Sequence, residues 1–373
     1  MIKKSIIHIS NIWHKMIKTS KMLTEFTSYH TMVVKGIATL ILCWHHLFWH
    51  YVTVPINFYG VKWSDVLVSV TKVCVALFTI LSGYGLCASY RKKEKMNVWR
   101  FSASHVGKLL IGYWWVYVPA FILSFWLHNY GTPLEIYSSS GNAIVNALLD
   151  FFGVRAFAYT PTLNNSWWYI EAAIAFYLLF PILKKMVDQV PIVILALSAL
   201  PVIALAGGFF WKPFITTDRE LYYLFPFVVG MCLARYGILD KIVRLSKRHR
   251  VGYMLGCLLL VLELAFVQTQ MGIWVDTFYA LSIVMLFVSV PITCSPLGSL
   301  LAWLGKHSMT IYLLHTFVYY YFGCTAQWLA RFDSKIIRYL VFIIVSCVLA
   351  LIIDGIKQSG KKVFHLLWVD ENM

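Results

Sequence analysis

The chain has 373 residues, of which 60% are hydrophobic and only 13% are charged. Soluble domains are about 45–50% apolar and about 25% charged, so this composition excludes an ordinary soluble globular protein. The formal net charge of +16 is explained more simply by basic loops that face anionic lipid than by nucleic acid, and we expect no nucleic-acid partner. The eight cysteines stand singly without a CxxC pair, which argues against a disulfide framework.

The N-terminal 30 residues form a basic segment ahead of the first long apolar run. They mix isoleucines and Trp13 with five lysines, a pattern typical either of a helix lying on an anionic membrane surface or of a disordered tail. The first apolar run starts after Val33 without a following cleavage site, so we expect a retained span. We therefore divide the chain into this tail (1–30), a membrane domain (31–356) and a C-terminal cytoplasmic tail (357–373).

Apolar blocks of roughly 18–22 residues, separated by charged residues, Pro and Gly, follow one another along the chain. Each block is long enough for a helix to cross about 30 Å of hydrocarbon. The sequence therefore predicts an all-α polytopic membrane protein, a bundle of about ten transmembrane helices. The spans are expected at 36–54, 66–88, 109–127, 167–183, 190–210, 221–237, 251–269, 274–291, 307–325 and 336–354.

The Lys and Arg residues divide unevenly between the two sides that this layout defines. The side that holds both termini carries 24 of the 32, and the opposite side carries eight. Because basic residues accumulate in cytoplasmic loops, both termini are predicted to be cytoplasmic. The longest exterior connection, 128–166, contains the apolar stretch from Ala143 to Val154, which predicts a short helix lying against the bundle.

The first span carries Lys35 at its mouth and then His45, His46 and His50. Ionisable groups within spans are costly and indicate function by default. Lys35 and His46 are about three helical turns apart and so share a face, whereas His45 points about 100° away. This face suits an anionic donor near Lys35 and a proton acceptor at His46. The alternative is that the histidines make hydrogen bonds between helices or lie at the outer interface.

Four segments resemble phrases of acyltransferase family 3, in the family's order. They are the run from Lys35-Gly to His46, the segment Leu77 to Tyr84 that ends in Leu-Ser-Gly-Tyr, the segment from Trp167-Trp-Tyr-Ile to Phe-Pro181, and the segment Leu304-Gly-Lys-His-Ser to Tyr-Leu-Leu-His315. Together they cover most of the chain. The order and spacing are specific to the family, although not to a substrate.

The resemblance implies a membrane-embedded enzyme that moves an acyl group, commonly acetyl from cytoplasmic acetyl-CoA, to hydroxyls of cell-surface glycans or glycolipids. His46 falls on the family's essential histidine, which implies a general base. The family's first-helix basic residue is usually Arg. Lys35 carries the same charge but lacks the planar guanidinium group that can bind a phosphate through two hydrogen bonds. We expect no permanently bound cofactor and no metal, and we keep a homodimer open. The expected location is the bacterial inner (plasma) membrane.

The basic stretch after the second span is the candidate for binding the phosphates of CoA. Where the family usually has an Arg-x-x-Arg pair, this chain has His105-Val-Gly-Lys108. The alternative is that the basic loop serves only to orient the protein in the membrane. The candidate donor-binding residues are Arg91, Lys92, Lys93, Lys95, Arg100, His105 and Lys108.

Three further residues complete the predicted site. Glu171 lies at membrane depth and is the third candidate catalytic residue beside His46 and Lys35, expected either to orient a histidine or to pair with a basic group. Trp168 and His315 are the candidates for binding the acceptor, although His315 could instead be an interfacial residue.

Two other classes compete with an enzyme. A transporter or flippase could use the same polar cavity, but it would be expected to show an internal repeat. A metal or haem protein would need ligands beyond His45, His46 and His50. Release of CoA separates the enzyme from the transporter.

Overall fold

The computed structural model describes residues 25–51, 57–58, 61–206, 219–289 and 295–370. These residues are helical apart from turns, connections and a two-residue antiparallel ribbon, in which strand β1 (Asn57–Phe58) pairs with β2 (Val61–Lys62). The expected all-α class is therefore confirmed. The predicted N-terminal tail lies almost entirely outside the described residues.

The first half of the chain holds α2 (Ser28–Tyr51), α3 (Trp63–Thr71), α4 (Cys74–Arg91), α5 (Val98–Leu127), α6 (Pro133–Ser138) and α7 (Ala143–Phe151), then the short helices η1 (Ala156–Ala158) and η2 (Asn165–Trp167) and the longer α8 (Trp168–Gln189) and α9 (Pro191–Ala206). The second half holds α10 (Arg219–Tyr222), α11 (Leu224–Arg235), α12 (Ile238–Arg248), α13 (Arg250–Met271), η4 (Gly272–Trp274), α14 (Asp276–Ser289), α15 (Pro296–Thr316), the π-helical turn η6 (Phe317–Tyr321), α16 (Gly323–Ala330) and α17 (Lys335–Asp370).

Five helical segments in the described ranges are long and apolar enough to cross a membrane. They are Ser28–Phe48, Val66–Arg91, Val98–Leu127, Arg250–Trp274 and Lys335–Ser359. The apolar helices α9, α11 and α14 are shorter. A helix overlaps each of the ten predicted spans, but the structure supports five crossings and not the full ten. Helix α17 continues to Asp370, through most of the region predicted as a C-terminal tail.

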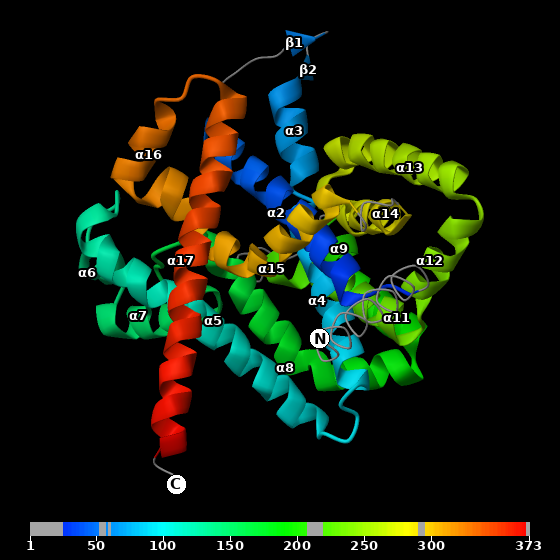
Figure 1. The fold of residues 1–373 in the computed structure, drawn as a ribbon, viewed down its shortest axis with the longest axis horizontal. Helices are drawn as coiled ribbons and strands as arrows, with labels where there is room; N and C mark the ends of the chain where they lie inside the picture. Colours follow the sequence, from blue (N-terminus) through cyan, green and yellow to red (C-terminus); the bar gives the residue numbers. More distant parts are fainter. Residues whose placement is uncertain (1–24, 52–56, 59–60, 207–218, 290–294, 371–373) are drawn as a thin grey trace, which may run out of the picture.

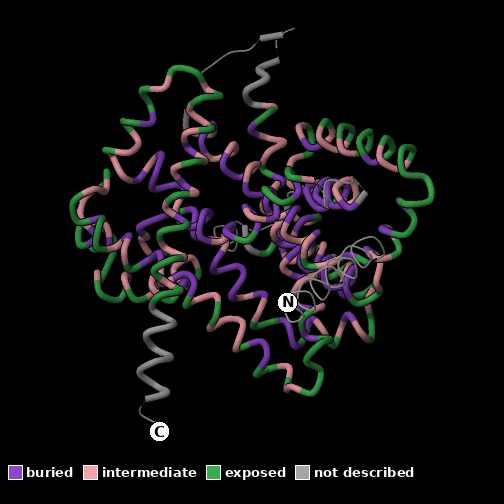
Figure 2. Tube along the Cα trace, in the orientation of Figure 1, coloured by how far each residue is buried: buried purple, intermediate pink, exposed green. Residues whose placement is uncertain are grey.

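The helices are arranged around a buried centre (Figures 1 and 2). Helix α17 runs from the top to the bottom of the view, and α13 with α14 and α6 with α7 lie on opposite flanks (Figure 1). Helix α13 leaves large apolar side chains exposed, among them Leu259 and Phe266 at 66% and 69%. Such a continuous apolar surface would be unfavourable in water, and hydrocarbon covers it without cost. Together with the five long apolar helices, it identifies an integral membrane protein.

Helices α2 and α15 pack backbone to backbone through two glycines. A Cβ atom at Gly36 would overlap the carbonyl oxygen of Leu301, and a Cβ at Gly305 would overlap that of Met32. Small residues are what allow helices in membranes to approach this closely. Gly83 of α4 and Gly230 of α11 form a second, reciprocal contact of the same kind. These glycines fix the positions of α2 and α4, which both carry residues of the site.

We expect Gly305→Ala to lower the thermal stability of the detergent-solubilised protein, by the order of 1–3 kcal/mol or more that overpacking costs. The added methyl group meets a backbone carbonyl, which cannot move aside as a side chain can. Gly256→Ala on α13 is the matched control, because a Cβ there meets nothing within 4 Å. The melting temperature of each variant is measured by monitoring its loss of folded protein on heating with size-exclusion chromatography. Equal melting temperatures would contradict the packing argument.

Candidate active site

A cavity of about 680 Å³ lies among helices α2, α4, α8 and α15. Lys35, His45 and His46 of α2 all line it. The structure therefore brings Lys35 and His46 to one cavity, as their shared helical face predicted. His45 also lines the cavity, although we expected it to face away, because the cavity extends around more of α2 than one face. The side chain of His50 lies outside the described residues.

Three histidine rings contact one another in a row beside this cavity. The His45 and His46 rings meet edge to face with 5.3 Å between their centroids, and the His46 and His315 rings do so at 4.8 Å. His45 donates from Nδ1 to the carbonyl oxygen of Val68, 2.9 Å away. His315 is wholly buried and donates from Nδ1 to the carbonyl oxygen of Tyr312, 2.6 Å away. Backbone contacts thus fix two of the three rings, one on each side of His46.

In the part of the chain that the structure describes, the lining of the cavity contains the lysines Lys35 and Lys72 but no acidic side chains. Lys72 lies between α3 and α4, close to His45, and was not among the predicted site residues. Asp276 interacts electrostatically with Lys72 but does not line the cavity, and a described lining that carries two lysines and no carboxylate suits an anionic group. No group of His, Cys, Asp or Glu able to hold a metal ion occurs within the described ranges.

Tyrosine and tryptophan side chains form much of the remaining wall. Trp168, the predicted acceptor-binding residue, lines the cavity and packs against Tyr223 with 5.6 Å between ring centroids. Tyr169 also lines it and accepts a hydrogen bond from Thr79 of α4, 3.3 Å away. Ser82 of the Leu-Ser-Gly segment faces the cavity beside this pair. His315 is held behind the wall and does not line the cavity itself.

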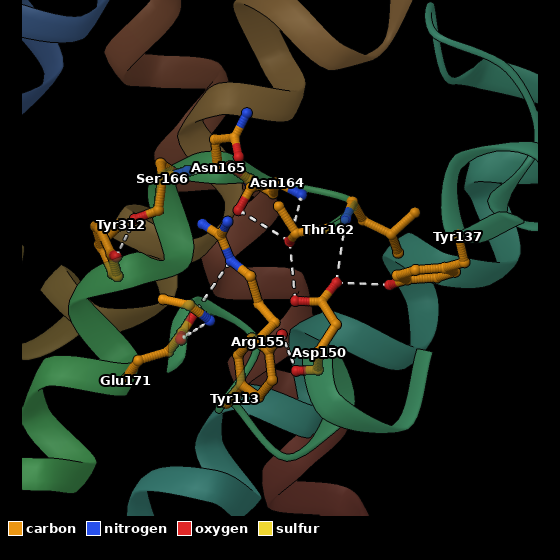
Figure 3. Close-up of polar contacts among 12 residues, drawn as sticks. Tyr113, Tyr137, Asp150, Arg155, Thr162, Asn164, Asn165, Ser166, Glu171 and Tyr312 are labelled. Carbon is orange, nitrogen blue, oxygen red and sulfur yellow. Dashed lines mark hydrogen bonds and ion pairs between the residues drawn. The ribbon is translucent and has the colours of Figure 1, made fainter. Parts of the chain in front are cut away.

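Glu171 does not line the cavity, and it pairs with a basic residue (Figure 3). Its Oε1 lies 3.1 Å from Nε of Arg155, and its Oε2 accepts the backbone N–H of Ala156. Of the two roles expected for Glu171, the structure shows the pairing with a basic group. The bond joins α8 to the segment that precedes it, so Glu171 supports the cavity wall from outside.

A buried polar network holds the segment 162–166 beside the cavity (Figure 3). Asp150 of α7 accepts hydrogen bonds from the Tyr137 hydroxyl at 2.6 Å, the Thr162 hydroxyl at 2.9 Å and the backbone N–H of Leu163 at 3.1 Å. Burial raises the pKa of Asp150 to about 6, although these hydrogen bonds favour the ionised form. The connection 128–166 contains two short α-helices, α6 and α7, followed by the single turn η1 and the start of η2, where we expected one short helix.

The same segment is tied to α15 at the cavity. Asn164 donates from its amide to the Thr316 hydroxyl, 2.6 Å away, and the Tyr312 hydroxyl donates to the carbonyl oxygen of Ser166. Asn165 and Ser166 then line the cavity. No pattern in the sequence indicated these contacts, since they join residues about 150 positions apart through an irregular segment.

The predicted donor-binding residues do not line the cavity. Arg91 donates to the carbonyl oxygen of Ala234 at 3.0 Å. Helix α5 begins at Val98, where the Asn97 side chain caps it by accepting the backbone N–H groups of Trp99 and Arg100. His105 and Lys108 therefore lie on a helix and not in the loop where we placed them. The exposed members of the set are Arg91, Lys92, Lys93, Lys95, Arg100 and Lys108.

The family of the chain follows from comparison with known proteins. A family model described as an acyltransferase domain matches residues 32–355, which is most of the chain. The chain belongs to acyltransferase family 3. Comparison with curated proteins and with solved structures found no match. Membership of acyltransferase family 3 supports an acyltransferase activity in the membrane.

Residues of the segments that resemble acyltransferase family 3 motifs have two kinds of role in the structure. Gly36, Gly83 and Gly305 serve close helix packing. Lys35, His46 and Trp168 line the cavity. The family phrases therefore combine residues that bring helices together with residues that face the space those helices enclose.

Proposed function

We propose that the protein transfers an acyl group, most simply acetyl, from cytoplasmic acyl-CoA to a hydroxyl group of a cell-surface or exported glycan or glycolipid. The observation that carries this proposal is the presence of Lys35 and His46 in one cavity within a member of acyltransferase family 3. The cavity has the size of a small-molecule site, in the range of about 300–1,000 Å³. Its two lysines suit an anionic donor.

In the proposed reaction, His46 acts as the general base. Its neutral imidazole takes the proton of the acceptor hydroxyl as the oxygen attacks the thioester carbonyl carbon. The carbon–sulfur bond breaks, and the CoA thiolate receives the proton from the imidazolium, so that His46 returns to its neutral form. The positive charge of Lys35 attracts the phosphates of the donor. The products are the acylated hydroxyl and free CoA.

The proposed topology has ten spans with both termini in the cytoplasm, in a bacterial inner membrane. It is supported by the charge division along the sequence. In Figure 1 the α4–α5 connection, rich in Lys and Arg, lies toward the same end of the molecule as the end of α17, and the α16–α17 connection lies toward the other. The exposed basic residues at 91–100 would then meet CoA at the cytoplasmic surface before it enters the cavity.

The proposed acceptor lies on the aromatic side of the cavity. Trp168 and Tyr169 offer ring faces, and Asn165 and Ser166 offer polar groups. Sugars present both apolar C–H faces and hydroxyls, so this mixture suits a carbohydrate. Asn165 and Ser166 are the last residues of the connection 128–166 that we place outside the membrane, which is the side where an exported glycan is met.

Mass spectrometry of surface glycans and lipids from cells with and without the protein tests the proposal. We expect one species to carry an additional acyl mass, 42 Da if the group is acetyl, only when the protein is present. Purified protein mixed with acetyl-CoA and the extract from deficient cells should release CoA as this species forms. An unchanged set of masses, together with no CoA release, would contradict the proposal and favour a transporter.

A further inference from the structure

His315 has a buried acceptor atom without a visible donor. The ring is wholly buried at the last turn of α15. Its Nδ1 bonds to the carbonyl oxygen of Tyr312, which can only accept, so Nδ1 carries the proton. In the neutral ring Nε2 is then an acceptor. Within the described residues Nε2 has no hydrogen-bond partner, and such an atom is costly to leave unsatisfied.

The ring of His46 is the neighbour that can satisfy this atom. The two rings meet edge to face, 79° apart, with 4.8 Å between their centroids. The other rings beside His315 belong to Tyr312 and Tyr319, which lie more nearly parallel to it at 6.1 Å and 6.2 Å. In an edge-to-face pair the perimeter of one ring, where its nitrogens lie, approaches the other ring, so a rotation of the His46 ring can bring one of its N–H groups to Nε2.

We propose that His315 is a positioning residue for His46, accepting one ring N–H of His46 at its own Nε2 and so leaving the second nitrogen of His46 as the acceptor that faces the cavity. A histidine base needs this kind of support, since the bond at one nitrogen decides which nitrogen holds the lone pair. The chain of contacts runs from the Tyr312 carbonyl through His315 to His46. This inference rests on the proposed role of His46 as general base.

Two variants of His315 separate its two nitrogens. Asparagine places a donor near the position of Nδ1, and it can keep the bond to the Tyr312 carbonyl while losing the acceptor at Nε2. Glutamine reaches the position of Nε2 and restores an acceptor there. We expect His315→Asn to lower kcat by about 10–100-fold, as for partners that orient metal-bound histidines. His315→Gln should recover most of that loss, and the KM for acetyl-CoA should change little in either variant.

The assay uses full-length purified protein, acetyl-CoA and the glycan extract, and each melting temperature is recorded. Activity retained by His315→Asn and lost by His315→Gln would assign the function to Nδ1 and overturn the proposal. A raised acceptor KM with unchanged kcat would also overturn it and make His315 an acceptor-binding residue. Wild-type protein without transfer would instead refute the proposed function, so the two failures differ.

Two further measurements decide the matter if the variants fold poorly. In His46→Ala protein, adding His315→Asn should cause no additional loss of kcat, because the residue acts through His46. An additional loss would contradict the proposal. In wild-type protein labelled with ¹⁵N-histidine, a coupling between the two ring nitrogens should appear in the solid-state NMR spectrum with a CoA thioether analogue bound. Its absence would contradict the proposed hydrogen bond.

Discussion

His46→Ala protein should be expressed and folded but should lose acyl transfer by about 10²–10⁴-fold, the usual contribution of a general base. His46 lines the cavity and is only partly buried, so removing its ring leaves the helix packing around Gly36 and Gly305 intact. The rate of CoA release in the presence of acceptor measures the loss. A purely structural His46 would instead lower yield or melting temperature while the surviving protein stayed active.

His45 provides the control for this prediction, because it also lines the cavity. Its Nδ1 is bonded to the Val68 carbonyl, so asparagine can keep that bond while removing the second ring nitrogen. We expect His45→Asn to retain most of the kcat of the wild type. If His45→Asn were inactive and His46→Ala active, the base would be His45 and our assignment would be wrong.

Lys35→Met should raise the KM for acyl-CoA by about tenfold to a hundredfold, since a hydrogen bond to a charged group contributes about 1.5–3 kcal/mol. Lys35 lines the cavity near the N-terminal half of α2. Lys35→Arg should be tolerated because it restores the family's usual residue and keeps the charge. Lys241→Met, at an exposed position on α12, is the matched control. Unchanged donor KM in Lys35→Met would remove Lys35 from donor binding.

The exposed basic residues give a useful contrast with Lys35. Neutralising Lys92, Lys93, Lys95 and Arg100 together should weaken acyl-CoA binding at low salt and much less at high salt, because exposed charges are screened. The effect of Lys35, which acts inside the cavity, should persist at high salt. If the quadruple variant bound the donor normally at low salt, the basic stretch would serve only membrane orientation.

Local periodicity predicted the parts of the site that lie on one helix. Lys35 and His46 are three turns apart on α2, and the helical repeat alone places them on one cavity. The same repeat misjudged His45, because it gives a direction from the helix axis and not the width of the cavity. Hydropathy located helices at all ten predicted spans, but their lengths depend on packing and capping, as the early start of α5 after Asn97 shows.

Contacts between segments far apart in the chain could not be predicted from the sequence. The partner of Glu171 is Arg155, in an irregular segment whose path depends on Asp150 and its buried hydrogen bonds. His315 was predicted as an acceptor-binding residue, but its burial behind His46 depends on the α2–α15 crossing. Lys72 had no predicted role in the site, and it reaches the cavity from the junction of α3 and α4.

A structure of the protein with a non-hydrolysable thioether analogue of acetyl-CoA bound tests the central claim most directly. We predict that the acetyl carbonyl lies in the cavity beside His46, with the CoA phosphates toward Lys35 and the exposed basic residues at 91–100. Density for the analogue outside this cavity, or with its acetyl group remote from His46, would contradict the account.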